Sequence, residues 1–142
     1  MARFEFKISP IFIKRLERLE NFDEVAEEML NAATPILEKY VKHEVAKHKD
    51  QGDLLKSIRR QKKPKKNNKG VWSTSVLPTG EDKHGVRNMA KLAHLEYGWF
   101  SHGIRDKDHY VPATPIITKA MKEARGEVNE KMLEVFEKWV TK

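Results

Sequence analysis

The longest regular pattern in the chain is an apolar stripe at helical spacing near its C-terminal end. Apolar residues recur every three or four positions from Ile117 to Trp139, and Pro112 and Pro115 precede them. This spacing places the apolar side chains on one face of a helix, and proline is favoured where a helix begins. The sequence therefore predicts a long amphipathic C-terminal helix.

A second stripe of the same period predicts a central helix, with Asn21 as its cap and its end near Lys49. Pro35 lies inside this stretch and removes one backbone N–H donor, so we expect a kink there. A shorter apolar run from Ile11 to Leu19 predicts two or three helical turns, with Ser9 as the cap. Two consecutive helices are therefore expected before residue 50.

Two regions have features of β-structure. Residues 3–8 alternate aromatic or aliphatic side chains with charged ones, which is typical of a strand with one buried face. Residues 57–63 and 71–77 flank a segment that contains Pro64 and the turn sequence from Asn67 to Gly70. Such a turn between two extended runs predicts a projecting β-hairpin.

Shorter elements are expected on either side of this hairpin. Gly52 is expected to end the central helix, and residues 53–58 to form a turn or short helix that leads into the hairpin. A polar loop over 78–85 precedes a second expected short helix, which ends at Gly98. The span 99–111 has no clear period, and the sequence predicts no regular element there.

These elements predict the α+β fold class: a small antiparallel sheet with a projecting basic β-hairpin, packed by two long helices, the central and the C-terminal one. With 142 residues, of which 39% are apolar and 35% charged, residues 1–142 are expected to form a single domain with a thin core.

We expect a soluble protein, because no apolar stretch reaches membrane-spanning length and the N-terminus lacks the apolar run of a signal peptide. The sequence contains no cysteine, which excludes disulfides and cysteine nucleophiles within it.

Positive charge is concentrated in the predicted hairpin. The net charge of the chain is +7, and residues 59–69 contain seven cations and no acid, so the remainder is neutral overall. Cations on a projecting tip can neutralise phosphates without reading a base sequence. The alternative is a solvated hairpin whose lysines and proline protect an edge strand from aggregation. The seven residues are Arg59, Arg60, Lys62, Lys63, Lys65, Lys66 and Lys69.

Two groups of residues invite a metal or catalytic hypothesis. His43 and His48 are five residues apart on the expected helix, which turns their side chains about 140° away from each other. A second group combines nitrogen and oxygen donors in one loop, but loops are ordinarily rich in such residues. We therefore expect no metal, no cofactor and no catalysis. The loop residues are His102, Asp106, Asp108 and His109.

A candidate subunit interface lies at the end of the second short helix. Glu96, Tyr97, Trp99 and Phe100 combine one acid with three large aromatic side chains. Aromatic side chains are enriched both in protein cores and at subunit interfaces. Glu96 is either an interface acid or a simple helix-end residue, and its position in the sequence does not distinguish the two.

Four stretches of the chain share their order and spacing with one known family. They are the helical region 16–40, the turn Gln51–Ile58, the helix Ala90–Gly98 and the segment Val111–Ala120 that leads into the last helix. This arrangement covers nearly the whole chain and resembles the gene-product-ten-like family of lambda-like siphophages. The members of that family are phage neck proteins, also described as head-tail joining, tail-completion or minor tail proteins.

The resemblance implies a structural virion protein of a tailed bacteriophage, without a cofactor, that joins the head to the tail within a neck ring. The first expected partners are further copies of the chain in a ring, which is expected to be a hexamer. The other expected partners are the neighbouring head-completion, tail-terminator or tail-tube proteins and the packaged DNA. The expected location is the virion and, during assembly, the bacterial host cytoplasm. The chain departs from the family pattern at Gln51, where threonine is usual, at 47–49, which replaces a Pro-Val-Asp lead-in, and in the loop 99–110.

Two other functions follow from the residues alone. A small nucleic-acid-binding protein without sequence preference would use the basic segment Arg59–Lys69. A metal-dependent enzyme would use the loop that contains His102 and His109. Salt-sensitive binding of DNA by a monomer would favour the first function, and a stoichiometric metal ion would favour the second.

Overall fold

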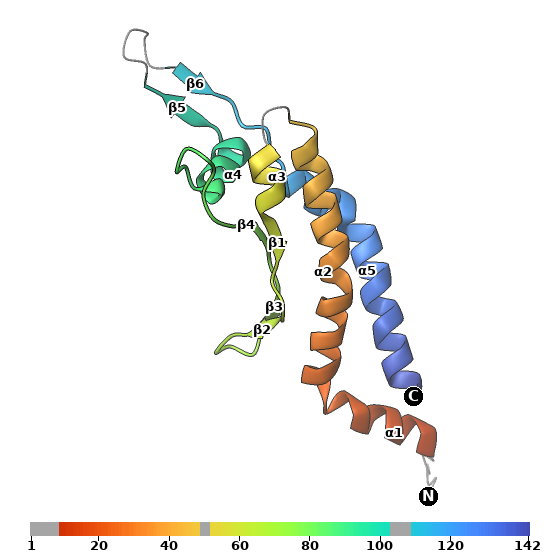
Figure 1. Ribbon diagram of the computed structural model, residues 1–142. Helices are drawn as coiled ribbons and strands as arrows, with labels where there is room; N and C mark the ends of the chain where they lie inside the picture. The colour runs from red at the N-terminus through yellow and green to blue at the C-terminus, as the bar shows by residue number, and fades with distance from the viewer. Residues whose placement is uncertain (1–8, 49–51, 103–108) are drawn as a thin grey trace, which may run out of the picture.

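Two long helices, α2 (Phe22–Ala46) and α5 (Ile117–Thr141), lie side by side and run in opposite directions (Figure 1). The structure is a computed structural model that describes residues 9–48, 52–102 and 109–142. Short antiparallel strands and three shorter helices complete the described residues. The predicted α+β class and both predicted long helices are therefore confirmed.

The helix α2 is continuous although Pro35 lies inside it, and it ends three residues before the predicted Lys49. The first helix, α1 (Pro10–Leu19), begins at the predicted proline. Ser9 and Asn21 occupy the predicted cap positions, but neither side chain makes a capping hydrogen bond. Their carbonyl oxygens instead accept hydrogen bonds from backbone N–H groups three or four residues further on.

The predicted basic hairpin is present as two short ladders. At its base, β1 (Ile58–Arg60) pairs with β4 (Val76–Pro78), and Ile58 lies opposite Pro78. Toward its tip, β2 (Lys65–Lys66) pairs with β3 (Trp72–Ser73). Both ladders are antiparallel, and a backbone hydrogen bond from Gln61 to Ser75 continues the pairing beyond the base.

Two short helices flank this hairpin in the sequence. Gly52 is the first residue of α3 (Gly52–Ser57), so the prediction that it ends the central helix is wrong. α4 (Asn88–Tyr97) ends at Gly98 as predicted, and this glycine has the positive φ of 75° that favours glycine at a helix end. The polar loop before α4 is held by Asp82, whose Oδ1 accepts hydrogen bonds from two backbone N–H groups.

A second hairpin occupies the span in which the sequence predicted no regular element. β5 (Trp99–Ser101) pairs with β6 (His109–Val111), and Trp99 lies opposite Val111. Each strand has only three residues, which is too short to show a period of two. The predicted strand at 3–8 and the residues 49–51 and 103–108 lie outside the described residues.

The hydrophobic core lies where α2, α3, α5 and the base of the hairpin meet. Leu54 of α3 and Ile58 of β1 are fully buried against Val41 and Val45 of α2 and against Ile116 at the start of α5. Ala120 and Ala124 of α5 are also buried, and their small side chains permit close approach of the two long helices. No helix in the described residues is long and apolar enough to cross a membrane.

One carboxylate is buried beside this core. Glu44 is only 3% exposed, and it accepts a hydrogen bond from Lys47 at 2.5 Å and lies 3.5 Å from the Lys119 ammonium of α5. The hydrogen bond from Lys47 holds the pKa of Glu44 below its usual value despite burial. Glu44 therefore adds an ion pair between α2 and α5 to their apolar contact.

Shortening a core side chain is expected to destabilise the whole fold. Leu54→Ala should lower the free energy of unfolding by about 2–5 kcal/mol, because it leaves a cavity at the junction of four elements. Leu133→Ala is the control, since Leu133 is 55% exposed, and it should change the free energy by less than about 0.5 kcal/mol. Urea unfolding followed by circular dichroism measures both. Equal effects of the two substitutions would contradict this placement of the core.

Candidate functional site

The basic hairpin is attached to the start of α2 through a single carboxylate. Asp23 accepts hydrogen bonds from the Lys66 ammonium at 2.7 and 2.9 Å and from the Trp72 indole N–H at 2.8 Å. The hydrogen bonds from Lys66 and then from Trp72 lower the pKa of Asp23. Because Lys66 and Trp72 are paired across β2 and β3, one acid fixes both strands of the tip.

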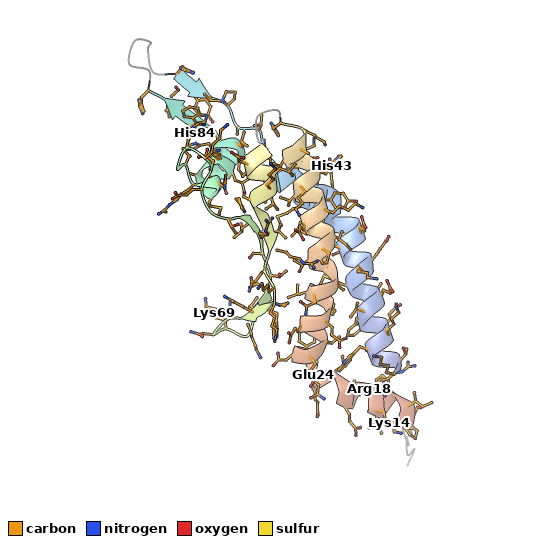
Figure 2. All side chains as sticks on the ribbon, in the orientation of Figure 1. Lys14, Arg18, Glu24, His43, Lys69 and His84 are labelled. Carbon is orange, nitrogen blue, oxygen red and sulfur yellow. The ribbon has the colours of Figure 1, made fainter. Side chains whose placement is uncertain are left out.

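The turn at the tip has a defined geometry. The Asn67 side-chain oxygen accepts hydrogen bonds from the backbone N–H groups of Lys69 and Val71, both at 2.9 Å. Gly70 has a φ of 78°, which an L side chain rarely adopts. The predicted asparagine and glycine turn is therefore confirmed, and Figure 2 places Lys69 at the end of the hairpin farthest from the long helices.

The structure divides the seven cations of the hairpin into two groups. Arg59 donates to the carbonyl oxygens of Lys56 and Ile58, Arg60 lies 3.7 Å from Glu38, and Lys66 pairs with Asp23. The other four ammonium groups are exposed and form no ion pair with any described residue. The charge available to a partner is therefore that of Lys62, Lys63, Lys65 and Lys69.

Glu96, one of the four predicted interface residues, caps the last helix of its own chain. Its carboxylate accepts hydrogen bonds from the backbone N–H groups of Ile116, Ile117 and Thr118 at 2.7, 2.8 and 3.1 Å, and from the Thr118 hydroxyl. Burial raises the pKa of Glu96, but these hydrogen bonds outweigh it and the net shift is downward. A carboxylate at this position also interacts favourably with the helix dipole.

The other three predicted interface residues lie on an exposed aromatic surface, which we call the aromatic end. Tyr97 and Phe100 are 77% and 64% exposed, and Trp99 is also exposed and stacks on His94 with ring centroids 5.4 Å apart. Tyr110, which the sequence did not single out, packs against Phe100 at 5.3 Å. The β5 and β6 pairing places Phe100 opposite Tyr110, so these two rings share one face of the hairpin, while Trp99, the neighbouring residue of β5, packs on His94 of α4.

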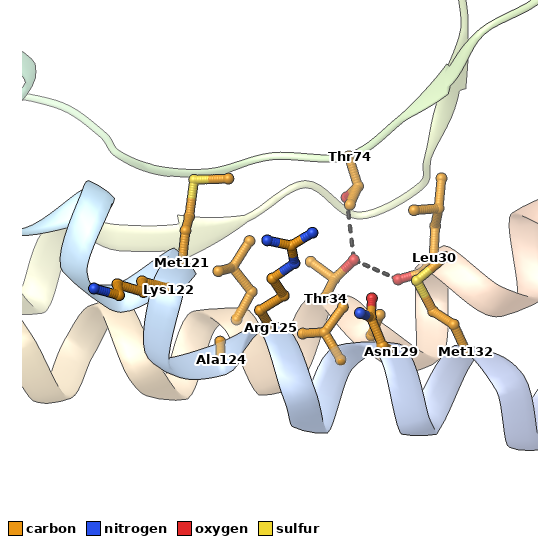
Figure 3. Close-up of a pocket in the computed structure, with 12 residues that line it drawn as sticks. Leu30, Thr34, Thr74, Met121, Lys122, Ala124, Arg125, Asn129 and Met132 are labelled. Atoms are coloured by element: carbon orange, nitrogen blue, oxygen red, sulfur yellow. Dashed lines mark hydrogen bonds between the residues drawn. The ribbon is translucent and has the colours of Figure 1, made fainter.

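An apolar groove lies between α2, α5 and the basic hairpin (Figure 3). It contains a cavity of about 490 Å³, and an adjoining cavity of about 320 Å³ shares Leu30 and Met132 with it. Thr34 of α2 and Thr74 of the hairpin are hydrogen-bonded at 3.2 Å on its wall. The sequence did not predict this groove. Its main apolar residues are Leu30, Ala33, Leu37, Met121, Val128 and Met132.

The histidine-based hypotheses gain no geometric support. Within the described residues, no group of three histidine, aspartate or glutamate side chains is placed to hold a metal ion. His109 lies in β6 opposite Ser101 of β5. Asp106 and Asp108 lie outside the described residues. His43 faces solvent on α2, where the sequence placed it.

Comparison of the chain with family models, curated proteins and solved structures finds no match.

Removing the Glu96 carboxylate is expected to destabilise the start of α5. Glu96→Ala should lower the free energy of unfolding by about 1–2 kcal/mol, as loss of a helix cap does. Glu130→Ala is the control, because Glu130 is exposed on the same helix and forms no ion pair with a described residue. Chemical unfolding at neutral pH measures both.

This contribution should also depend on pH. Since the folded-state pKa of Glu96 is lowered, its stabilisation is present above the unfolded pKa of 4.5 and is lost as pH falls through the lower, folded-state value. The stability difference between the wild type and Glu96→Gln should therefore shrink as pH falls below 4.5. A difference that stays constant from neutral pH to strongly acidic pH would contradict the cap.

Proposed function

We propose that the chain is a structural virion protein of a tailed bacteriophage and joins the head to the tail as a subunit of a neck ring. The observation that carries the proposal is the position of its exposed apolar surfaces. α1 lies at one end of the elongated molecule and the aromatic end at the other (Figure 1). A subunit that links two assemblies needs two such distinct contact surfaces.

The exposure of these surfaces supports assembly. α1 has no buried residue, and the aromatic end exposes four large aromatic side chains. Soluble monomers rarely expose contiguous apolar patches of more than a few hundred Å², and larger ones mark interaction sites. We therefore place partners over α1 and over the aromatic end. In the proposed neck these partners are further copies and adjacent head-completion, tail-terminator or tail-tube proteins.

The basic hairpin has a separate role in this proposal. Its four lysines without an ion pair to a described residue are exposed, and Figure 2 shows Lys69 at the end of the tip, whose backbone Asp23 and Asn67 hold in place. Ammonium groups on such a tip can neutralise phosphates without reading a base sequence. We therefore place the tip toward packaged DNA or toward an acidic surface of an adjacent ring.

Deleting the gene in the phage or prophage that encodes the chain tests the proposed function. The lysate should then contain DNA-filled or emptied heads and separate tails, since the joint between them is missing. Negative-stain electron microscopy distinguishes these particles from intact virions, and a plasmid copy of the gene serves as the control that restores joining. Normal numbers of joined, infectious virions after deletion would overturn the proposal.

A second candidate function is binding of nucleic acid without sequence preference by the free protein. It is favoured by the same four exposed lysines on the tip, which form no ion pair within the part of the chain that the structure describes. Sedimentation velocity with and without a short DNA duplex separates the two functions. A monomer that moves fully onto DNA at low salt and dissociates as salt rises supports nucleic-acid binding. A ring-sized species, or a protein that ignores DNA, supports the neck protein.

Neutralising the tip should weaken any interaction that the protein makes with phosphates. If the protein binds duplex DNA, the logarithm of its affinity falls as the logarithm of the salt concentration rises. Replacing all four lysines by glutamine should make this slope shallower by about 3–4, at roughly 0.9 for each phosphate that the protein no longer neutralises. The four lysines to replace are Lys62, Lys63, Lys65 and Lys69.

The control for this variant removes the same number of charges elsewhere on the surface. In virions, the tip variant should impair docking of the neck and retention of the genome, measured as DNA released from purified particles, whereas the control should not. Unchanged docking and genome retention in the tip variant would remove the hairpin from the proposed function. The control replaces Lys39, Lys56, Lys83 and Lys142 by glutamine.

A further inference from the structure

We propose that α1 of one copy docks in the apolar groove of a second copy, and that repetition of this contact builds the ring. The inference rests on the neck-ring function proposed above and specifies its subunit contact. It joins two features of the same chain, an exposed amphipathic helix and an open apolar groove. The partner is thus a second copy of this chain.

The first feature is the stripe on α1, formed by Phe12, Ile13, Leu16 and Leu19. All four side chains are exposed, Phe12 by 52%. They lie on one face, and Arg18 lies about 160° around the helix from Leu16. The Arg18 guanidinium donates to the carbonyl oxygen of Val140 at 3.3 Å, which attaches the opposite face of α1 to the end of α5. The stripe is therefore held facing outward.

The second feature is the groove, and its dimensions suit this helix. Along α5 it extends from Met121 to Met132, which corresponds to about 16 Å at 1.5 Å per residue. The ten residues of α1 span about 15 Å by the same measure. Leucine, methionine, alanine and valine side chains form most of the groove lining, and they match the aliphatic and aromatic stripe in polarity.

The two features lie on different parts of one molecule. Figure 1 shows that α1 leaves the lower end of α2 and extends beneath the C-terminal end of α5, whereas the basic hairpin lies on the other side of α2. Since the hairpin forms one wall of the groove, the stripe and the groove occupy different surfaces. A contact between two different surfaces is heterologous, and its repetition closes a ring when the rotation between copies permits.

The charges beside the two surfaces are opposite. Glu17 lies about 40° around the helix from Ile13, beside one edge of the stripe, and Glu20 follows as the C-cap of α1. Lys122 and Arg125 line the groove. None of these four residues forms an ion pair with a described residue. Figure 3 shows Arg125 reaching from α5 across the groove toward the hairpin. Docking of the stripe with its acidic edge toward α5 brings these unpaired charges together and fixes the orientation of α1.

A mixing experiment tests this contact. The helix variant Phe12→Glu with Leu16→Glu has a defective stripe and an intact groove. The groove variant Met121→Glu with Arg125→Glu has the reverse, and the altered side chains of both variants are exposed, so folding is expected to persist. Sedimentation velocity from about 1 μM to about 1 mM protein measures the oligomeric state.

The wild type should associate beyond the dimer, each variant alone should be monomeric, and an equal mixture should form dimers and nothing larger. The dimer is expected because the mixture contains one intact groove and one intact stripe per pair. The matched control, Val86→Glu with Leu133→Glu, replaces two exposed side chains outside both surfaces and should associate like the wild type. A mixture that remains monomeric, or variants that associate like the wild type, would overturn the proposal.

Charge reversal provides a second measurement. Glu17→Lys with Glu20→Lys should weaken association by roughly tenfold or more, as should Lys122→Glu with Arg125→Glu. The protein that carries all four substitutions should recover most of this association, because opposite charges face each other again. Absence of this rescue would exclude the proposed orientation of α1.

The gene deletion and the mixing experiment together distinguish a failure of this contact from a failure of the proposed function. If deletion of the gene leaves heads and tails unjoined while the helix variant still associates, the contact is wrong and the neck function stands. If joined virions form without the gene, the function is wrong, and the mixing experiment still decides the contact. A wild-type protein that stays monomeric throughout, as it would if α1 folded onto its own groove, overturns the contact.

Discussion

The packing of α2 against the other elements is the constraint on which the rest of the structure depends. α2 contacts α5 along one side, and α3, β1, β3 and β4 along another. At its C-terminal half, Val41 and Val45 complete the core with α3 and the base of the hairpin. At its N-terminal half, the side chains of Asp23 and Thr34 contact the hairpin. The apolar groove remains open between α2, α5 and the hairpin. One helix thus fixes the core, the hairpin and the groove relative to each other.

The two long helices and α1 could be predicted from the sequence because each repeats its apolar period over several turns. The basic hairpin could be predicted because glycine and asparagine mark its turn. β5 and β6 could not, since three residues per strand carry no period, and the aromatic surface formed by their pairing was recognised only as separate aromatic residues. The groove was also beyond prediction, because its residues come from α2, α5 and the hairpin and meet only in the folded chain.

The charges of the candidate site could be predicted from the sequence, but their partners could not. The sequence places seven cations in one segment, but their partners are distant: Asp23 is 43 positions from Lys66, and Glu38 belongs to the middle of α2. Only the fold shows that three cations are engaged within the chain, whereas the other four are exposed and form no ion pair with a described residue. For Glu96 the sequence leaves two roles open, because an acid beside aromatic residues predicts either an interface residue or a helix-end residue. The fold directs its carboxylate to the first N–H groups of α5.

Gly98 links the end of α4 to the aromatic surface. A Cβ atom at this position would lie 2.7 Å from the backbone carbonyl oxygen of Val111 and would also meet the ring of Tyr110, at a φ of 75°. A smaller residue in place of Tyr110 would remove only the second clash, because the carbonyl oxygen belongs to the backbone of β6. Glycine at position 98 is therefore required by the path of the chain and not by the identity of the rings around it. In diverged sequences whose aromatic residues have changed, a glycine directly after this helix would mark the hairpin and show that its backbone has been retained.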